Sequence, residues 1–289
     1  MKKTFVLYNP LAGDQSGKAG AEKLSQYFSE TQMEYRDIRT IVDYSAFARE
    51  IGSEDAIVIY GGDGTLNRFV NGIYDLKLQN EIFYYAAGSG NDFLRDIGAS
   101  VEDGPVQINT YIQNLPSVTV NGQVYRFLNG VGYGIDGYCC EVGDAQRQQG
   151  KKPNYTAIAI TGLLFHYNAT NATVTVDGKK YNYKRVWIAP TMHGRYYGGG
   201  MMAAPDQDRT APENGETVVI MHKAGRLGTL CIFPSIFEGK HIKHTKKVGV
   251  HTGHEITVEF DRPVTLQIDG ETILDVSKYQ VTSSVLVKK

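Results

Sequence analysis

Glycines and small polar residues gather in three short segments of the chain, at residues 9–17, 61–65 and 88–92. Glycine lets a backbone come close to an anion, and the free N–H groups at a helix start point toward it. Gly61-Gly62-Asp63-Gly64-Thr65 matches neither G-x-G-x-x-G nor G-x-x-x-x-G-K-[ST], the common dinucleotide and NTPase patterns. One such segment also suits a merely tight turn, whereas three together favour a phosphate site.

Asp63 lies inside this candidate phosphate loop. A carboxylate there would repel a phosphate unless a cation or a network of donors stands between the two groups. Mg²⁺ that is bound to phosphates commonly meets protein carboxylates in this way. The residues therefore predict a metal–nucleotide complex as the ligand.

The elements that position these segments alternate between strand and helix. Strands are predicted at residues 4–8, 33–40, 56–60 and 82–86, and helices at about 19–28, 44–51 and 66–73 and shortly after 92. This alternation favours a parallel sheet with helices on both faces. Ligands of such sheets bind at the carboxyl ends of the strands, where all three glycine segments fall.

The second half of the chain changes to a hairpin pattern. Asn121-Gly122, Asp177-Gly178 and Asp269-Gly270 each lie between two strand-like runs, which is the strongest short-range signal for a β-hairpin. We therefore predict a mainly antiparallel β domain at residues 118–279, interrupted by one helix at residues 155–166. It follows an α/β domain at residues 1–117, on which a tail at about residues 280–289 is expected to pack back.

Composition limits the class of protein. The chain has 289 residues, 42% of them hydrophobic, and a formal net charge of −1 from 30 basic and 31 acidic residues. This balance carries no nucleic-acid signature, so no nucleic-acid partner is predicted. Three cysteines without a C-x-x-C pair argue against a disulfide framework or a zinc ribbon. No run approaches the roughly 18 apolar residues of a spanning helix, and a soluble, cytoplasmic protein is predicted.

Four histidines could suggest a zinc site, since they are spaced as two pairs, His241 with His244 and His251 with His254. The interval between them is basic and strand-like, and it holds no acidic or cysteine ligand. These histidines are therefore interpreted as part of a solvated strand edge.

Several motifs occur in the order found in a known family. They are Asn9-Pro10 with Gly13, Gly61–Thr65, Gly88-Ser89-Gly90-Asn91-Asp92-Phe93 and Asp269-Gly270-Glu271, and residues 129–136 and 198–205 look like two further blocks. The chain thus resembles the diacylglycerol kinase catalytic-domain family, which includes sphingosine and ceramide kinases. Each motif alone is weak, but the ordered set runs from residue 9 to residue 271 and is specific.

The resemblance implies an α/β nucleotide domain like that of NAD kinases and phosphofructokinases, followed by a C-terminal antiparallel β-sandwich. It also implies ATP as the nucleotide and Mg²⁺ as its cation. The nucleotide-binding residues that it carries over are Asn9, Pro10, Leu11, Ala12, Gly13, Thr40, Gly61, Gly62, Asp63, Gly64, Thr65, Leu66, Asn67 and Ser89.

The resemblance places the general base in Asp269-Gly270-Glu271, with Glu271 as the expected base and Asp269 close by. The reverse assignment, with Glu271 orienting Asp269, stays open because the two acids lie across one turn. Asp269-Gly270 is also a hairpin turn, so only the resemblance raises Glu271 above an acid that flanks a turn. Asp63 and Asp92 are assigned to the metal-and-water network of the ATP phosphates. Phosphoryl transfer to an alcohol needs such a cation, donors on the γ-phosphoryl oxygens and a carboxylate that takes the hydroxyl proton.

Two departures from the relatives affect the predicted metal and nucleotide sites, and a third, Gly88-Ser89-Gly90 in place of a Gly-Thr form, keeps a hydroxyl. Relatives that bind a structural Mg²⁺ in the second domain use an Asp-Gly after an Ala-Pro block, and here the corresponding pair is Asn214-Gly215. Loss of a charged oxygen ligand weakens a site for a hard cation, so Asn214 marks a weakened structural Mg²⁺ site. Where many relatives carry a glutamate after the second glycine segment, this chain reads Leu66-Asn67-Arg68.

The predicted activity is ATP- and Mg²⁺-dependent phosphorylation of the primary hydroxyl of diacylglycerol or a similar lipid. Two alternatives stay open: a kinase of a soluble alcohol such as NAD or a sugar phosphate, and a nucleotide-binding regulatory protein without turnover. A lipid substrate predicts peripheral, reversible membrane contact through an apolar and basic rim of the second domain. A homodimer is also left open.

Overall fold

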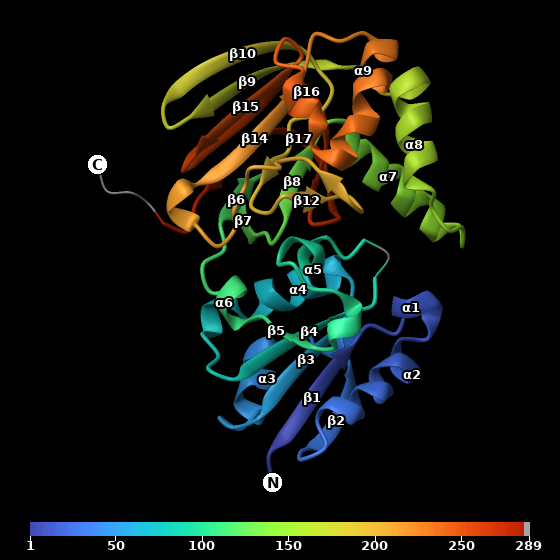
Figure 1. The fold of residues 1–289 in the computed structure, drawn as a ribbon, viewed down its shortest axis with the longest axis vertical. Coiled ribbons are helices and arrows are strands. Elements are labelled where there is room, and N and C mark those ends of the chain that lie inside the picture. The colour runs from blue at the N-terminus through green and yellow to red at the C-terminus, as the bar shows by residue number, and fades with distance from the viewer. Residues whose placement is uncertain (89, 286–289) are drawn as a thin grey trace. The chain divides into compact units, whose positions relative to one another are not determined.

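The computed structural model describes residues 1–88 and 90–285, without the side chains of residues 14 and 15. The chain folds as two compact units, the first from Met1 to Asn114 and the second beginning at Leu115 (Figure 1). Each unit has its own sheet and its own hydrophobic core.

The first unit is built on a sheet with the strand order β2-β1-β3-β4-β5. Its strands are β1 (Lys3–Tyr8), β2 (Gln32–Asp37), β3 (Ala56–Gly61), β4 (Glu81–Ala86) and β5 (Val106–Gln107). The first four are parallel, and β5 is antiparallel to β4. Every residue of β3 is buried, as expected for the central strand of a parallel sheet that is covered on both faces. The predicted α/β fold is confirmed.

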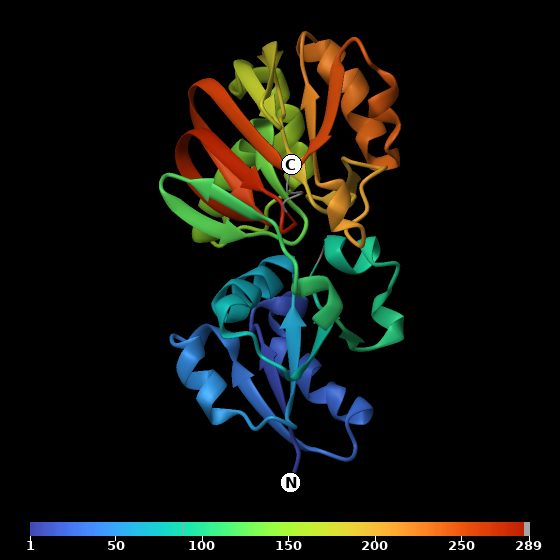
Figure 2. The same cartoon turned by 90° about the vertical axis from the view of Figure 1, so that its left-hand side faces the viewer.

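Helices lie on both sides of this sheet (Figure 2). α1 and α2 cover the face that carries Val58 and Tyr60, whereas α3 covers the opposite face, where the Phe47 ring stands edge-on to Phe5 at 5.8 Å between centroids. The helices of the unit are α1 (Ala12–Gln15), α2 (Gly17–Glu22), α3 (Tyr44–Glu50), α4 (Asp63–Ile73), α5 (Asp92–Asp96) and α6 (Asn109–Ile112).

Two predicted elements differ from the structure. The strand predicted at residues 33–40 ends at Asp37, because the Asp37 carboxylate accepts the N–H of Arg39 at 3.0 Å and caps a 3₁₀ turn over Ile38–Thr40. The helix predicted at about residues 19–28 starts earlier, as α1 and α2, and continues as a 3₁₀ turn at Lys23–Tyr27. The start of α2 packs closely on the residue that follows β1, since a Cβ on Gly17 would lie 2.0 Å from the carbonyl oxygen of Asn9.

The second unit is organised around one large antiparallel sheet with the order β15-β14-β11-β8-β16-β17-β6-β7, and β9 pairs with β10 and β16. The β16–β17 hairpin joins the first hairpin of the unit, β6–β7, to β8. The strands are β6 (Ser117–Val120), β7 (Gln123–Arg126), β8 (Gly130–Tyr133), β9 (Thr170–Val176), β10 (Lys179–Val186), β11 (Thr191–Met192), β14 (Glu216–Met221), β15 (Val248–Gly253), β16 (Glu255–Ile268) and β17 (Glu271–Thr282), with β12 (Tyr196–Tyr197) and β13 (Met201–Met202) paired apart from them.

The three predicted hairpins are confirmed, and each turn has the backbone that its sequence favours. Both central residues have positive φ in every case: 49° and 78° at Asn121-Gly122, 48° and 81° at Asp177-Gly178, and 46° and 94° at Asp269-Gly270. Two successive positive φ values are the mark of the type I′ turn that suits a twisted hairpin.

Helices are more numerous here than predicted. In the described part of this unit, α7 (Ile135–Gln148) and α9 (Arg226–Ile232) accompany the predicted helix, which forms as α8 (Tyr155–Thr161) and a π-helical turn at Gly162–His166. α7 escapes prediction because its tyrosine and cysteines are weak helix formers, so packing decides its conformation. A Cβ on Gly137 would lie 1.8 Å from the carbonyl oxygen of Thr265 on β16, which shows how closely α7 is packed.

The interpretation of the histidines is wrong for His241. This residue is completely buried in a 3₁₀ turn (Lys240–Lys243), and its Nε2 lies 2.9 Å from the carbonyl oxygen of Ala203. None of the helices in the described residues is long and apolar enough to cross a membrane.

Candidate functional site

The three glycine segments meet at the carboxyl edge of the first unit's sheet. The Asn9 N–H donates to the carbonyl oxygen of Tyr60 at 3.0 Å, and the Gly13 N–H donates to that of Ala87 at 3.1 Å. The Ala87 N–H in turn donates to the carbonyl oxygen of Gly61 at 2.9 Å. Backbone hydrogen bonds thus join the first segment to the residues directly before the other two, and the second segment to Ala87, as the prediction of one shared edge requires.

Asn9 fixes the first segment against the start of α4. Its side-chain amide donates to the Thr65 hydroxyl at 3.0 Å, and its side-chain oxygen accepts the N–H of Leu11 at 3.0 Å. The Ala12 N–H donates to the Asn9 carbonyl oxygen, also at 3.0 Å. One asparagine therefore shapes the turn through Pro10 and attaches it to the second segment.

The second and third segments touch through two glycines. A Cβ on Gly88 would lie 2.7 Å from the Cα of Gly62, and a Cβ on Gly62 would lie 3.3 Å from the Cα of Gly88. Gly62 has a φ of −89°, so its need for glycine comes from this close approach and not from a left-handed backbone. Gly62 caps α4, so the N–H groups of Gly64 and Thr65 belong to the first turn of a helix, where intrahelical acceptors are missing.

Asp63 connects the second segment to the third. Its carboxylate accepts the backbone N–H groups of Asp92 at 2.8 Å and Phe93 at 3.3 Å, which begin α5. A carboxylate at a helix start is stabilised by the helix dipole as well as by these bonds. Asp92 itself is buried. The structure thus gives Asp63 a positioning role, and the metal role of both aspartates stays a prediction.

The other predicted nucleotide residues differ in accessibility. Leu66 and Asn67 are buried on α4, and the Asn67 side-chain oxygen accepts from the Asn71 amide at 3.1 Å. Thr40 is exposed in the 3₁₀ turn after β2, and its hydroxyl donates to the Asp37 carbonyl oxygen at 2.8 Å. Ser89 lies outside the described residues.

In the second unit, the turn between β16 and β17 carries the predicted general base. The Asp269 carboxylate accepts the N–H groups of Leu128 at 2.5 Å, Asn129 at 2.9 Å and Gly130 at 3.0 Å. Burial raises the pKa of the Asp269 carboxyl, while these three hydrogen bonds and the charge of Arg209 act in the opposite direction. Asp269 therefore anchors the turn to the start of β8.

Glu271 differs from Asp269 in exposure and in hydrogen bonding. It is exposed at the first position of β17, opposite Ile268, and its carboxylate makes no hydrogen bond to another described residue. The next residue, Thr272, donates its hydroxyl to the Asp144 carboxylate of α7 at 2.6 Å, which holds the strand start in place. The geometry favours Glu271 over Asp269 as a proton acceptor.

Sequence reasoning missed Arg209, which supports this turn. Arg209 is largely buried, and its guanidinium donates to the side-chain oxygen of Asn129 at 3.0 Å. Asn129 is the residue whose backbone N–H binds Asp269. Nothing in the spacing of the sequence connects Arg209 to residues 128–130 or 269.

The residues around Asn214 do not fit a structural cation site. The carbonyl oxygen of the following residue, Gly215, already accepts the side-chain amide of Gln207 at 3.0 Å. Asn214 is exposed at the end of a 3₁₀ turn, and its side chain makes no hydrogen bond to another described residue. Glu216 is buried, but its two oxygens bind His193 and Ser283, each at 3.1 Å.

Asp136 at the start of α7 is a further buried acid that the prediction left without a role. The Tyr197 hydroxyl donates to its carboxylate at 2.6 Å. Burial raises the pKa of Asp136 to about 7, and the Tyr197 bond acts in the opposite direction. This carboxyl therefore changes charge near neutral pH.

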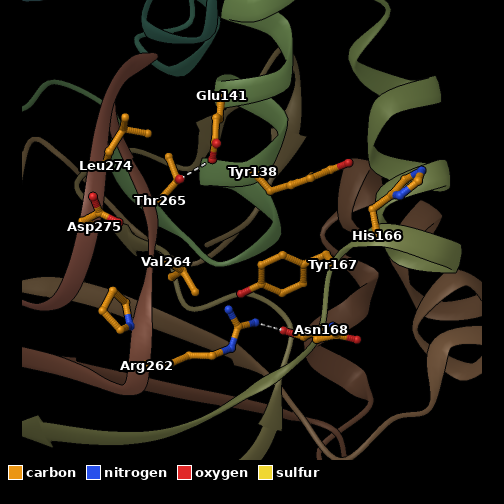
Figure 3. Close-up of a pocket in the computed structure, with 11 residues that line it drawn as sticks. Tyr138, Glu141, His166, Tyr167, Asn168, Arg262, Val264, Thr265, Leu274 and Asp275 are labelled. Atoms are coloured by element: carbon orange, nitrogen blue, oxygen red, sulfur yellow. Dashed lines mark hydrogen bonds between the residues drawn. The ribbon is translucent and has the colours of Figure 1, made fainter.

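A cavity of about 340 Å³ lies within the second unit, between α7, the end of the π-helical turn and the irregular part of β16–β17 (Figure 3). Arg262 donates to the Asn168 carbonyl oxygen there, and its guanidinium carbon lies 5.8 Å from the centroid of the Tyr167 ring. Among the described residues, none that the sequence assigned to the site lines this cavity. Its charged walls do not suit an acyl chain.

Comparison with known families gives two matches that together span nearly the whole chain. A family described as "Diacylglycerol kinase catalytic domain" matches residues 3–122, and one described as "YegS C-terminal NAD kinase beta sandwich-like domain" matches residues 129–286. The second match alone covers more than half of the chain.

Individual relatives agree with these matches. The chain is 24% identical to "Putative lipid kinase YtlR" of Bacillus subtilis over 98% of this chain and 97% of that protein. It is also 24% identical to a diacylglycerol kinase of Bacillus subtilis, over 94% of this chain and 90% of the relative.

A crystal structure titled as a "putative diacylglycerol kinase" from Bacillus anthracis shares the fold, with a TM-score of 0.67 and 18% identity over 98% of this chain and 93% of that one. The predicted combination of an α/β domain and an antiparallel β-sandwich domain is confirmed.

Proposed function

Because the chain belongs to the diacylglycerol kinase catalytic-domain family, we propose that it transfers the γ-phosphoryl group of ATP to the hydroxyl of diacylglycerol or a similar lipid alcohol. The names of the relatives support a lipid acceptor. The observation that carries the proposal is the closure of three glycine segments at one sheet edge by Asn9 and Asp63. A phosphate chain is the ligand that such closely approached backbone N–H groups suit best.

In this proposal, the N–H groups of Gly64 and Thr65 at the start of α4 bind the ATP phosphates. Mg²⁺ supplies the positive charge that phosphoryl transfer needs on the phosphate oxygens. Asp63 would hold the water shell of this ion. A carboxylate has about four acceptor positions, so the same side chain can accept backbone N–H groups and metal-bound water.

Glu271 takes the proton of the acceptor hydroxyl in the proposed reaction. It is exposed and without a hydrogen bond to the described residues, so its carboxylate is available to a substrate. Asp269 is a positioning residue, because its carboxylate is occupied by three backbone N–H groups. The proton passes from the alcohol to Glu271 as the alcohol oxygen attacks the γ-phosphorus, the bond from that phosphorus to the bridging oxygen breaks, and ADP leaves.

We also propose peripheral contact with a membrane, because a diacylglycerol acceptor resides in one. The second unit exposes large apolar side chains, among them Phe165 at 71% and Leu227 at 73% exposure, and it carries basic residues from Lys240 to Lys247. Vesicle sedimentation tests this point. We expect binding that increases with anionic lipid and decreases with salt, and binding indifferent to both would contradict the idea.

The decisive experiment is transfer of labelled phosphate from ATP, with diacylglycerol, ceramide, sphingosine and NAD offered in parallel. We expect a labelled lipid product that depends on Mg²⁺. A label found only on NAD would overturn the lipid assignment. ATP binding without transfer to any acceptor would favour the regulatory-protein alternative.

A further inference from the structure

The loop before β14 departs from the metal site that the family resemblance implies. At Asn214-Gly215 the charged ligand is absent, and the neighbouring carbonyl oxygen is already paired. Side chains from the same loop make the hydrogen bonds that hold this region. Two of them, Gln207 and Arg209, are more than nine-tenths buried.

Gln207 holds the two ends of this loop together. Its amide nitrogen donates to the carbonyl oxygen of Gly215 at 3.0 Å, and its amide oxygen accepts the hydroxyl of Thr217 at 2.5 Å. A backbone carbonyl oxygen is the kind of atom that ligates Mg²⁺, so this bond uses a potential metal ligand. Thr217 also contacts the hydroxyl of Thr252 at 2.9 Å, which extends the bonds to β15.

Arg209 connects the same loop to the turn that carries the base. Its guanidinium donates to the Asn129 side chain at 3.0 Å, and its positive charge acts against the burial that raises the pKa of Asp269. Asn129 and its two neighbours donate their N–H groups to Asp269. A continuous set of hydrogen bonds therefore runs from Arg209 to the residue two positions before Glu271.

We propose that Gln207 closes the loop at residues 207–217 and that Arg209 fastens this loop to the β16–β17 turn, without a structural cation, so that Arg209 is a positioning residue for Glu271. The guanidinium provides a fixed positive charge beside Asp269, and it is always protonated. Gln207 fixes the shape of the loop through its hydrogen bonds to Gly215 and Thr217. Mg²⁺ is then needed only with the nucleotide. That last statement and the kinetic tests rest on the proposed function, whereas the thermal tests do not.

The first test measures the melting temperature of the nucleotide-free chain with Mg²⁺ and with EDTA. We expect the same melting temperature in both, because the loop is fastened by side chains. A rise in melting temperature with Mg²⁺ that Asn214→Ala abolishes would show a working cation site and overturn the proposal.

The second test removes the Gln207 hydrogen bonds at nearly constant side-chain size. Gln207→Met should lower the melting temperature by roughly 3–6 °C, since it removes the side-chain partner of the buried Gly215 carbonyl oxygen and one of the two partners of the Thr217 hydroxyl. Gln280→Met, at an exposed position of β17, is the matched control and should leave the melting temperature unchanged. Equal melting temperatures for Gln207→Met and the control would refute the fastening role.

The third test separates positioning from folding. Arg209→Met should lower kcat about tenfold or more while KM for ATP stays the same, since misplacement of a catalytic group costs rate and not nucleotide binding. Loss of the guanidinium also removes a charge that opposes protonation of Asp269, and a protonated Asp269 would hold its three N–H donors less well and misplace Glu271, so the acid limb of the pH–rate profile should move to higher pH. Arg209→Lys keeps the charge and should return that limb toward its original position.

An Arg209→Met variant with unchanged kcat and pH profile would overturn the positioning role. If this variant does not fold, Asn129→Ala tests the same link, because it removes the acceptor of Arg209 and keeps the charge. It should lower kcat without changing KM for ATP, and an unchanged kcat would again refute the link. If no acceptor is phosphorylated at all, the thermal tests still decide the fastening role.

Discussion

Asp63 and Asp269 perform similar tasks in turns of different construction. Both carboxylates accept backbone N–H groups of another segment, two from the start of α5 for Asp63 and three from residues 128–130 for Asp269. Asp63 lies beside glycine backbone at a helix start, where N–H groups can bind an anion. Asp269 is enclosed by its donors, and the exposed carboxylate belongs to Glu271. The same residue type therefore joins two segments of a candidate ligand site in one turn and only shapes the other turn.

The largest expected effect tests the division of roles in the second turn. Glu271→Gln removes the base but keeps the shape, so turnover should fall by roughly two to four powers of ten while ATP binding stays near normal. Glu259→Gln, another exposed glutamate of the same hairpin, is the control and should keep full turnover. Steady-state kinetics and a nucleotide-binding assay measure both. Full turnover in Glu271→Gln would show that this turn has only a structural role.

Asp269→Asn should instead damage stability. An amide nitrogen facing three N–H donors leaves at least one of them unpaired, at a cost of about 2–3 kcal/mol. For a unit of this size, that corresponds to a fall in melting temperature of roughly 4–10 °C. Thermal unfolding followed by circular dichroism measures it. If the variant melted like the parent chain and lost only turnover, Asp269 would be the base.

Asp63→Asn should affect ligand binding more than folding. The variant keeps an acceptor oxygen for one N–H of α5 but loses the negative charge that would meet metal-bound water. We expect Mg²⁺-dependent ATP binding to weaken about tenfold, a loss of about 1.4 kcal/mol. Titration calorimetry with and without Mg²⁺ measures the effect. Unchanged affinity in both conditions would limit Asp63 to its structural bonds.

The smallest expected effect concerns pH. Because the pKa of Asp136 in the folded chain is about 7, above its ordinary value of 3.8, its favourable contribution is complete below pH 3.8 and is lost as the pH rises through 7. Between pH 6 and pH 8, the free energy of unfolding should fall by about 1 kcal/mol relative to Asp136→Asn. Asparagine still accepts the Tyr197 hydroxyl. Denaturant unfolding at both pH values measures the difference, and parallel pH dependence in the two chains would refute it.

Much of the fold follows from local sequence. The three hairpins were predictable because Asn-Gly and Asp-Gly are among the few pairs that accept two successive positive φ values. The parallel sheet followed from alternating strands and helices, and the shared edge of the glycine segments followed from that topology. α7 was missed because its residues are poor helix formers and its conformation depends on packing against β16.

The site was predictable only in part. The types and positions of Asp63, Asp269 and Glu271 could be read from motifs, but the N–H groups that the two aspartates bind are backbone atoms that carry no sequence signal. Arg209 was missed for a related reason. Its partners are distant in sequence, and its contact with Asn129 exists only after the sheet has assembled. Sequence patterns record local geometry, whereas these bonds arise from tertiary structure.

The pairing of β17 has a consequence for synthesis of the chain. β17 (Glu271–Thr282) joins β6 to the rest of the second sheet, so a strand near residue 120 must wait for one near residue 280. The strands of the first unit all lie before residue 108 and can pair much earlier during translation. The first unit could therefore fold as it emerges from the ribosome, well before the second sheet could close. In the interval, the β6–β7 hairpin would present an unpaired edge on which chaperones could act.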